Sequence, residues 1–161
     1  MQFGEFRRAC PELAELAEER LRRAEVLLLG TLRRNGWPRI TPVECDFVGD
    51  DLMIGMMWRS PKALDLMRDP RCVVHTVVPD RQGTQGDAKL YGTAVAVEEP
   101  ERRAAYRETI FARIGWQPEE PEYHLYAIDV TSAGFVIFGD HRYALAWDPE
   151  RGLRRMAQRE S

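Results

Sequence analysis

Lysine and cysteine are scarce in this chain. Lys62 and Lys89 are the only lysines among 161 residues, and arginine supplies the other side-chain cations. The three cysteines, Cys10, Cys45 and Cys72, are odd in number and form no CxxC pair. Neither a disulfide framework nor a zinc site is therefore indicated. The net charge of −3 gives no reason to expect a nucleic-acid partner.

Long apolar runs are also missing. No stretch approaches the roughly 18 consecutive apolar residues that a membrane-spanning helix needs. The segment after Met1 is charged and lacks the apolar core and small-residue cleavage site of a secretory signal peptide. We therefore expect a cytoplasmic protein that has no membrane partner.

The residue patterns of metal sites and hydrolytic triads are absent as well. His75, His124 and His141 share neither HxH nor HxxxH spacing, so we expect no metal site. No serine lies in a nucleophile elbow, so a hydrolase triad has no support. No side chain can be assigned as a catalytic residue from the sequence.

The apolar residues that are present predict mostly strands, with a few helices. An N-terminal helix is predicted over about 11–24, because proline and acids open this segment and arginines close it. Asn35-Gly36 is a strong hairpin signal. Strands are predicted over 26–32, 39–47, 52–57, 72–78, 89–98, 123–130, 134–138 and 143–147, further helices over 60–67 and 100–114, and a C-terminal tail from about 149.

This order of elements predicts one domain over 1–161 that is mainly β with peripheral helices. Helices and strands do not alternate regularly, which argues against a doubly wound parallel sheet. Antiparallel strands joined by tight turns instead indicate a barrel.

The segment Trp58–Lys62 joins the end of a predicted strand to the start of a helix. Free amide groups at a helix N-terminus attract anions, and Arg59, Ser60 and Lys62 lie at that point. The pattern is consistent with a phosphate site. It is equally typical of a helix capped by Ser60 that carries a solvated Arg/Lys pair.

Two prolines interrupt the strand predicted around residues 39–47. Pro38 and Pro42 limit its ladder hydrogen bonds and leave backbone groups at Thr41 and Val43 without partners. Those groups suit the polar edge of a flat heterocycle. The alternative is an edge strand that proline protects from aggregation.

Four segments together resemble the pyridoxamine phosphate oxidase-like, FMN-binding split-barrel superfamily, which also contains deazaflavin-dependent reductases. They are Leu29–Leu32, Gly36–Val43, Ser60–Arg71 and Tyr91–Val95. The resemblance implies a six-stranded antiparallel split β-barrel of Greek-key type, which forms a homodimer and holds a flavin in the dimer cleft.

The resemblance also assigns binding residues, position by position. One strand would line the flavin ring and ribityl chain with Arg39, Ile40, Thr41, Pro42 and Val43. The following strand end and turn would hold the phosphate with Met56, Met57, Trp58, Arg59, Ser60 and Lys62. The second subunit would close the site, with Trp116, Phe138, Arg142 and Trp147 as candidates.

Two positions depart from true pyridoxamine phosphate oxidase. Glu44 stands where the oxidase has a lysine, and Pro61 stands where it has an arginine. A carboxylate would repel a phosphorylated substrate, so the substrate is not expected to be a vitamin B6 phosphate. A neutral, cationic or largely apolar small molecule is expected instead.

The function expected from this resemblance is that of an FMN-binding oxidoreductase, in which the cofactor carries the redox chemistry. Two alternatives stay open: a deazaflavin-dependent reductase, and a non-catalytic protein that binds flavin or haem. The expected partner is a second copy of the chain, with Val136, Ile137 and Phe138 in the interface.

Overall fold

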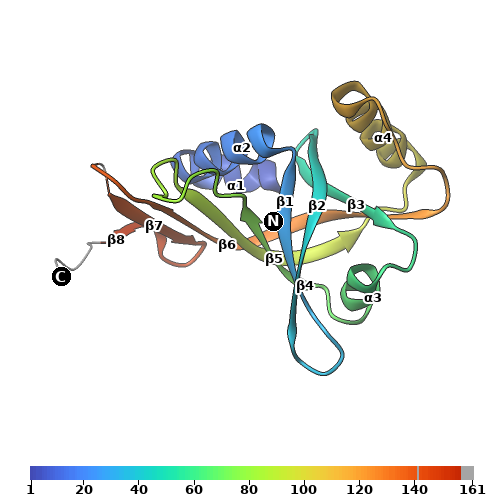
Figure 1. Ribbon diagram of the computed structural model, residues 1–161, viewed down its shortest axis with the longest axis horizontal. Helices are drawn as coiled ribbons and strands as arrows, with labels where there is room; N and C mark the ends of the chain where they lie inside the picture. Colours follow the sequence, from blue (N-terminus) through green and yellow to red (C-terminus); the bar gives the residue numbers. More distant parts are fainter. Residues whose placement is uncertain (141, 157–161) are drawn as a thin grey trace.

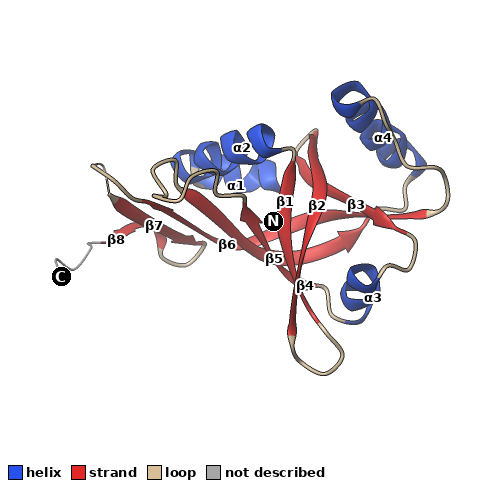
Figure 2. Ribbon diagram, viewed as in Figure 1, coloured by secondary structure: helices blue, strands red, loops and turns tan. Residues whose placement is uncertain are grey.

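The computed structural model describes residues 1–140 and 142–156, so His141 and residues 157–161 lie outside the description. Figures 1 and 2 show its helices and strands. The helices are α1 (Phe3–Ala9), α2 (Pro11–Ala24), α3 (Pro61–Arg68) and α4 (Pro100–Ile114). The strands are β1 (Val26–Leu32), β2 (Pro38–Val48), β3 (Asp51–Met57), β4 (Arg71–Thr76), β5 (Asp87–Ala96), β6 (Tyr123–Ile137), β7 (Tyr143–Asp148) and β8 (Gly152–Met156).

The strands form one antiparallel sheet that closes on itself. Its order is β3-β2-β1-β4-β5-β6-β7-β8, and β3 also pairs with β6. That additional pairing closes β1 to β6 into a six-stranded barrel, whereas β7 and β8 extend the sheet beyond it. The predicted six-stranded antiparallel barrel is therefore confirmed.

One prediction about the C-terminal third was wrong, and one strand there was not predicted. The segments 123–130 and 134–138 were expected as separate strands, but β6 is continuous. The pairing of β5 with β6 steps from Tyr91↔Ser132 to Gly92↔Val130, so Thr131 is an extra residue in β6. Such a bulge bends a strand without ending it, which is why the two expected strands are one. The expected tail from about 149 contains β8, which pairs with β7 through Asp148↔Gly152.

Helices α1 and α2 pack against the barrel core. Phe3 and Phe6 of α1 are fully buried, and their rings lie 4.8 Å from Phe47 and 4.9 Å from Trp147, centroid to centroid. The predicted helix over 11–24 coincides with α2. The sequence did not predict α1, whose seven residues are too few to show a clear apolar periodicity.

Helix α4 covers a different part of the barrel. Tyr106 and Ile110 of α4 pack with Met53 of β3 and with Tyr123 and Leu125 of β6 in a second apolar cluster. The helix runs from Pro100 to Ile114, with Gly115 as its C-cap, as predicted. This packing holds α4 and the loop that follows it beside β3 (Figure 1).

No helix in the described parts of the chain combines the length and the apolar character needed to cross a membrane.

Candidate functional site

The site begins where β2 and β3 separate. The two strands pair only from Val48↔Asp51 to Cys45↔Ile54. Beyond that point β2 continues along β1, and β3 continues along β6. From Pro38 to Glu44, one edge of β2 therefore has no strand partner among the described residues, and its backbone groups are open to a ligand.

A cavity of about 530 Å³ opens at this separation, and we call it the cleft. Its walls come from β2, β3, the start of α3, α4 and the loop after α4. Lys62 is the one cation among the described residues that line it, and three lining carboxylates, Glu44, Glu119 and Glu122, accompany it. Lys62 itself is half-buried and makes no ion pair with any described residue.

Two tyrosines stand on the α4 side of the cleft. A Cβ on Gly55 of β3 would lie 2.6 Å from the hydroxyl oxygen of Tyr106, so glycine at this position makes room for that hydroxyl. Burial raises the pKa of Tyr106, and it raises the pKa of Tyr123 to about 12. Both hydroxyls thus stay protonated at neutral pH and can donate hydrogen bonds.

The start of α3 leaves polar groups free. Ser60 occupies the N-cap position and Pro61 the first turn, as predicted. The predicted side-chain cap is absent, however: the Ser60 hydroxyl is buried and has no partner in the described structure. The turn before the helix places Arg59 at a left-handed φ of 50°. Unbonded N–H groups, a free hydroxyl and Lys62 together suit a phosphate.

The structure brings together part of the predicted cofactor site. Pro42, Val43, Met56, Met57 and Lys62 line the cleft. The remaining predicted residues, Arg39, Ile40, Thr41, Trp58, Arg59 and Ser60, are not among the residues that line it.

Three of these outlying residues have clear positions. The Ile40 side chain is 70% exposed on the outer face of the barrel. The Thr41 hydroxyl is buried and lacks a partner in the described structure. The Trp58 ring stacks on His124, with centroids 4.4 Å apart and planes 2° apart.

Trp58 and His124 line a second cavity, of about 650 Å³, which shares Tyr123 with the cleft. Burial lowers the pKa of His124, and the nearby charges of Arg103 and Arg59 lower it further. The imidazole is therefore neutral at neutral pH, and its Nε2 atom is buried with no described partner.

The candidates for the second subunit fall in different places. Trp116 lines the cleft of its own chain. Trp147 is 3% exposed and packs on Phe6 in the core, which leaves no ring surface for a partner's site. Phe138 and Arg142 are exposed, and they lie in the connection between β6 and β7.

Sequence reasoning missed Tyr106, Glu119, Glu122 and Tyr123 as cleft residues. Gly55 within β3 was the available signal, because a glycine inside a strand often marks a close approach by another group. In the described parts of the chain, no three potential metal ligands come together.

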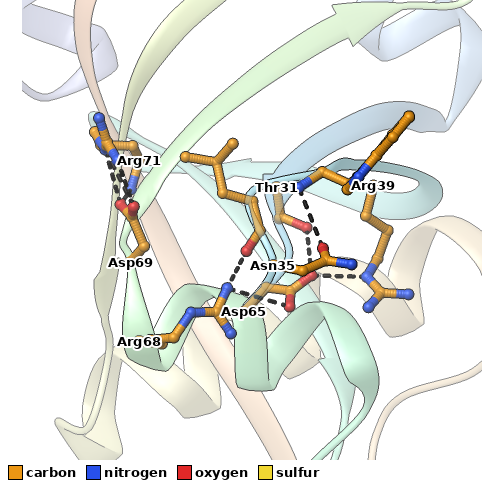
Figure 3. Close-up of polar contacts among 9 residues, drawn as sticks. Thr31, Asn35, Arg39, Asp65, Arg68, Asp69 and Arg71 are labelled. Carbon is orange, nitrogen blue, oxygen red and sulfur yellow. Dashed lines mark hydrogen bonds and ion pairs between the residues drawn. The ribbon is translucent and has the colours of Figure 1, made fainter.

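A buried carboxylate fixes α3 against the β1–β2 hairpin (Figure 3). Asp65 accepts hydrogen bonds from the Thr31 hydroxyl at 2.9 Å and from Arg39 Nε at 2.7 Å, and Arg68 lies 3.5 Å away. Burial by itself raises the pKa of Asp65, but the bonds from Arg39 and Thr31 and the charges of the two arginines outweigh it. The net shift is downward, so Asp65 is ionised at neutral pH.

Solved structures share this fold at low sequence identity. An FMN-binding protein from Nostoc punctiforme, described as related to pyridoxamine 5'-phosphate oxidase, is 16% identical, with a TM-score of 0.69 and coverage of 93% of this chain and 96% of that one. PhzG from Burkholderia lata, in complex with tetrahydrophenazine-1-carboxylic acid, is 14% identical, with a TM-score of 0.61 and coverage of 88% and 85%.

A haem-binding protein from Mycobacterium smegmatis is 21% identical, with a TM-score of 0.64; the match covers 84% of this chain and only 58% of that one. Identities in this range establish the fold and not the ligand. None of the curated proteins matches the chain.

The model of the pyridoxamine 5'-phosphate oxidase family matches residues 13–137, which run from α2 to the end of β6 and include every strand of the barrel. The chain therefore belongs to the pyridoxamine 5'-phosphate oxidase family.

Proposed function

We propose that this protein binds FMN in the cleft and acts as an oxidoreductase on a small molecule that carries no phosphate. The observation that carries this proposal is the separation of β2 from β3 beside the start of α3. That separation puts an open backbone edge, a cavity and a phosphate-suited helix start next to one another.

The polar groups left without partners support a flavin phosphate at the start of α3. The Ser60 hydroxyl and Lys62 would hold the phosphate, and the open edge of β2 at Pro42–Glu44 would face the ring. When bound, FMN supplies hydride or electron transfer. Trp116 and Tyr123 would wall the ring.

The charge of the cleft supports the proposed substrate class. Glu44, Glu119 and Glu122 stand against a single Lys62, which the cofactor phosphate would neutralise. A second phosphate brought by a substrate would then meet three carboxylates in a partly enclosed space, which costs binding energy. Neutral, cationic or largely apolar substrates avoid this cost.

We further propose that the working form is a homodimer. Strand register places Ile40, Gly30, Val73 and Tyr91 in one row across β2, β1, β4 and β5. Ile40 and Tyr91 are exposed to 70% and 48%. This row is a better interface candidate than 136–138, because Ile137 packs against its own core.

A second candidate function is the binding of a tetrapyrrole without catalysis. The observation that favours it is His124, which lines the cavity of about 650 Å³ and whose neutral imidazole has no described partner at Nε2. A neutral imidazole nitrogen is a common axial ligand of haem iron. A deazaflavin coenzyme in the cleft is a further alternative, because it would use the same phosphate position.

Reconstitution followed by turnover tests the proposal. The purified protein would be titrated with FMN, a deazaflavin coenzyme and haemin, and the complex that forms would be assayed with menadione and biliverdin as acceptors. We expect saturable FMN binding and reoxidation of the reduced complex by an acceptor. Haemin binding without FMN binding would contradict the proposal and support the second candidate. A monomer at micromolar concentration in analytical ultracentrifugation would contradict the dimer.

A further inference from the structure

A second charged feature lies on the other side of α3 from the cleft. An open cavity of about 860 Å³ separates the β1–β2 turn from the helix, and we call it the arginine hollow. Its charged lining consists of Arg33 and Arg34 from the turn, Arg39 from β2, and Asp65 and Arg68 from α3. Four guanidinium groups thus face one carboxylate, although the whole chain has a net charge of −3.

This excess is unusual for the chain, which pairs many of its arginines with acids. Arg7 pairs with Glu18, and Arg113 pairs with Asp46. Arg33 and Arg34, by contrast, make no side-chain hydrogen bond or ion pair with any described residue. Neighbouring like charges without counterions repel each other, so a bound anion would relieve this repulsion.

The hollow is also partly ordered in advance. Asp65 accepts a hydrogen bond from the Nε of Arg39. The two terminal amino groups of Arg39 have no described partners. Arg68 is held by the carbonyl oxygen of Leu32 and by Asp65 (Figure 3). Guanidinium groups fixed in this way lose less conformational entropy when they bind an anion.

We propose that the arginine hollow binds a small polyphosphate anion, at a site separate from the cleft. Guanidinium groups pair with phosphate oxygens through two parallel hydrogen bonds, and several such groups around one open space need more than one phosphate to satisfy them. Pro61 and Leu64 are the only apolar residues among the described residues that line the hollow. A ligand would therefore be recognised mainly by the charged groups. This proposal does not depend on the identity of the ligand in the cleft.

Calorimetric titration with inorganic pyrophosphate tests the proposal, with citrate as a polycarboxylate comparison. The variant is Arg33→Gln/Arg34→Gln, and the matched control is Arg151→Gln, which changes an exposed arginine outside the hollow. We expect pyrophosphate to bind the parent and the control equally, and to bind the double variant at least about tenfold more weakly. Equal pyrophosphate affinity for all three proteins would overturn the proposal. If the parent bound citrate more tightly than pyrophosphate, the ligand class would be a polycarboxylate and the polyphosphate proposal would be wrong.

Lys62→Ala separates the hollow from the cleft. If pyrophosphate binds in the hollow, Lys62→Ala should bind it as tightly as the parent does. If pyrophosphate instead binds at the start of α3, Lys62→Ala should bind it more weakly. Backbone amide shifts of the parent protein provide a second measurement that needs no variant: pyrophosphate should shift the signals of Asn35 and Leu64. Shifts confined to cleft residues such as Gly55 would overturn the proposal.

Discussion

The two sides of helix α3 differ sharply in charge and in how well their cations are fixed. On the cleft side, Lys62 stands alone among three carboxylates and is held by no ion pair in the described structure. On the hollow side, four arginines line one cavity together with Asp65, which orients two of them. Helix α3 thus lies between the cleft, whose charges suit one phosphate on a flat ligand, and the arginine hollow, whose charges suit several phosphates.

The difference shows how a buried acid can organise both surfaces. Asp65 is 4% exposed and ties α3 to Thr31 of β1 and Arg39 of β2. The same contacts that orient the arginines of the hollow therefore also hold the helix start at the cleft. A substitution at Asp65 should therefore alter ligand binding both in the hollow and in the cleft.

Replacing the shared anchor gives the largest expected effect. Asp65→Asn leaves Arg39 and Arg68 beside a neutral amide, and breaking a buried ion pair from one side costs about 3 kcal/mol or more of unfolding free energy. Urea denaturation measures this loss. Asp69→Asn is the control, because its partner Arg71 is 71% exposed, and a much smaller loss is expected. Equal losses for the two variants would contradict the anchoring role of Asp65.

Acid should weaken the same anchor in the parent protein. The folded-state pKa of Asp65 is lowered below its ordinary value of 3.8, so its stabilising contribution is complete above that value and is lost as the pH falls through the lower folded-state pKa. We expect the unfolding free energy to drop on acidification below about pH 4, and to drop less steeply in Asp65→Asn. Parallel pH profiles for the parent and the variant would disagree with this assignment.

The smallest expected effect concerns the charge of the cleft. Glu44→Gln removes one of the three carboxylates and should strengthen the binding of pyridoxamine phosphate to the flavin-loaded protein by roughly fivefold, or about 1 kcal/mol. Glu108→Gln on the exposed face of α4 is the control. Competition binding measures the change. If Glu44→Gln bound pyridoxamine phosphate no more tightly than the parent does, Glu44 would not be the residue that excludes phosphorylated substrates.

The barrel was predictable from the sequence because its signals are local. The turn at Asn35-Gly36, the helix boundaries at Pro100 and Gly115, and the apolar strands each depend on neighbouring residues. The start of α3 was likewise located through Ser60 and Pro61.

The walls of the cleft were harder to predict because they depend on packing between distant segments. Tyr106 and Trp116 reach the cleft only because α4 packs across β3 and β6. Trp147 was misjudged for the same reason: its burial depends on Phe6 of α1, a helix that the sequence did not predict. The arginine hollow was also missed, since Arg33 and Arg34 look like ordinary solvated turn residues until α3 is placed beside them.

The central claim is that the cleft holds the ring of FMN while Lys62 and the start of α3 hold its phosphate. Fluorescence titration with FMN and with riboflavin, which lacks the phosphate, tests it most directly in the parent, Lys62→Ala and Lys89→Ala proteins. Lys89 is the matched control, because it is the other lysine and is ion-paired with Asp87 on β5.

We predict that the parent and Lys89→Ala bind FMN about 10- to 150-fold more tightly than riboflavin, which corresponds to about 1.5–3 kcal/mol for a charge-assisted contact. In Lys62→Ala this preference should shrink by about tenfold or more through weaker FMN binding alone, and the Ser60 hydroxyl and the free N–H groups should account for what remains. An undiminished FMN preference in Lys62→Ala, or equal affinities for the two flavins in the parent, would contradict the account.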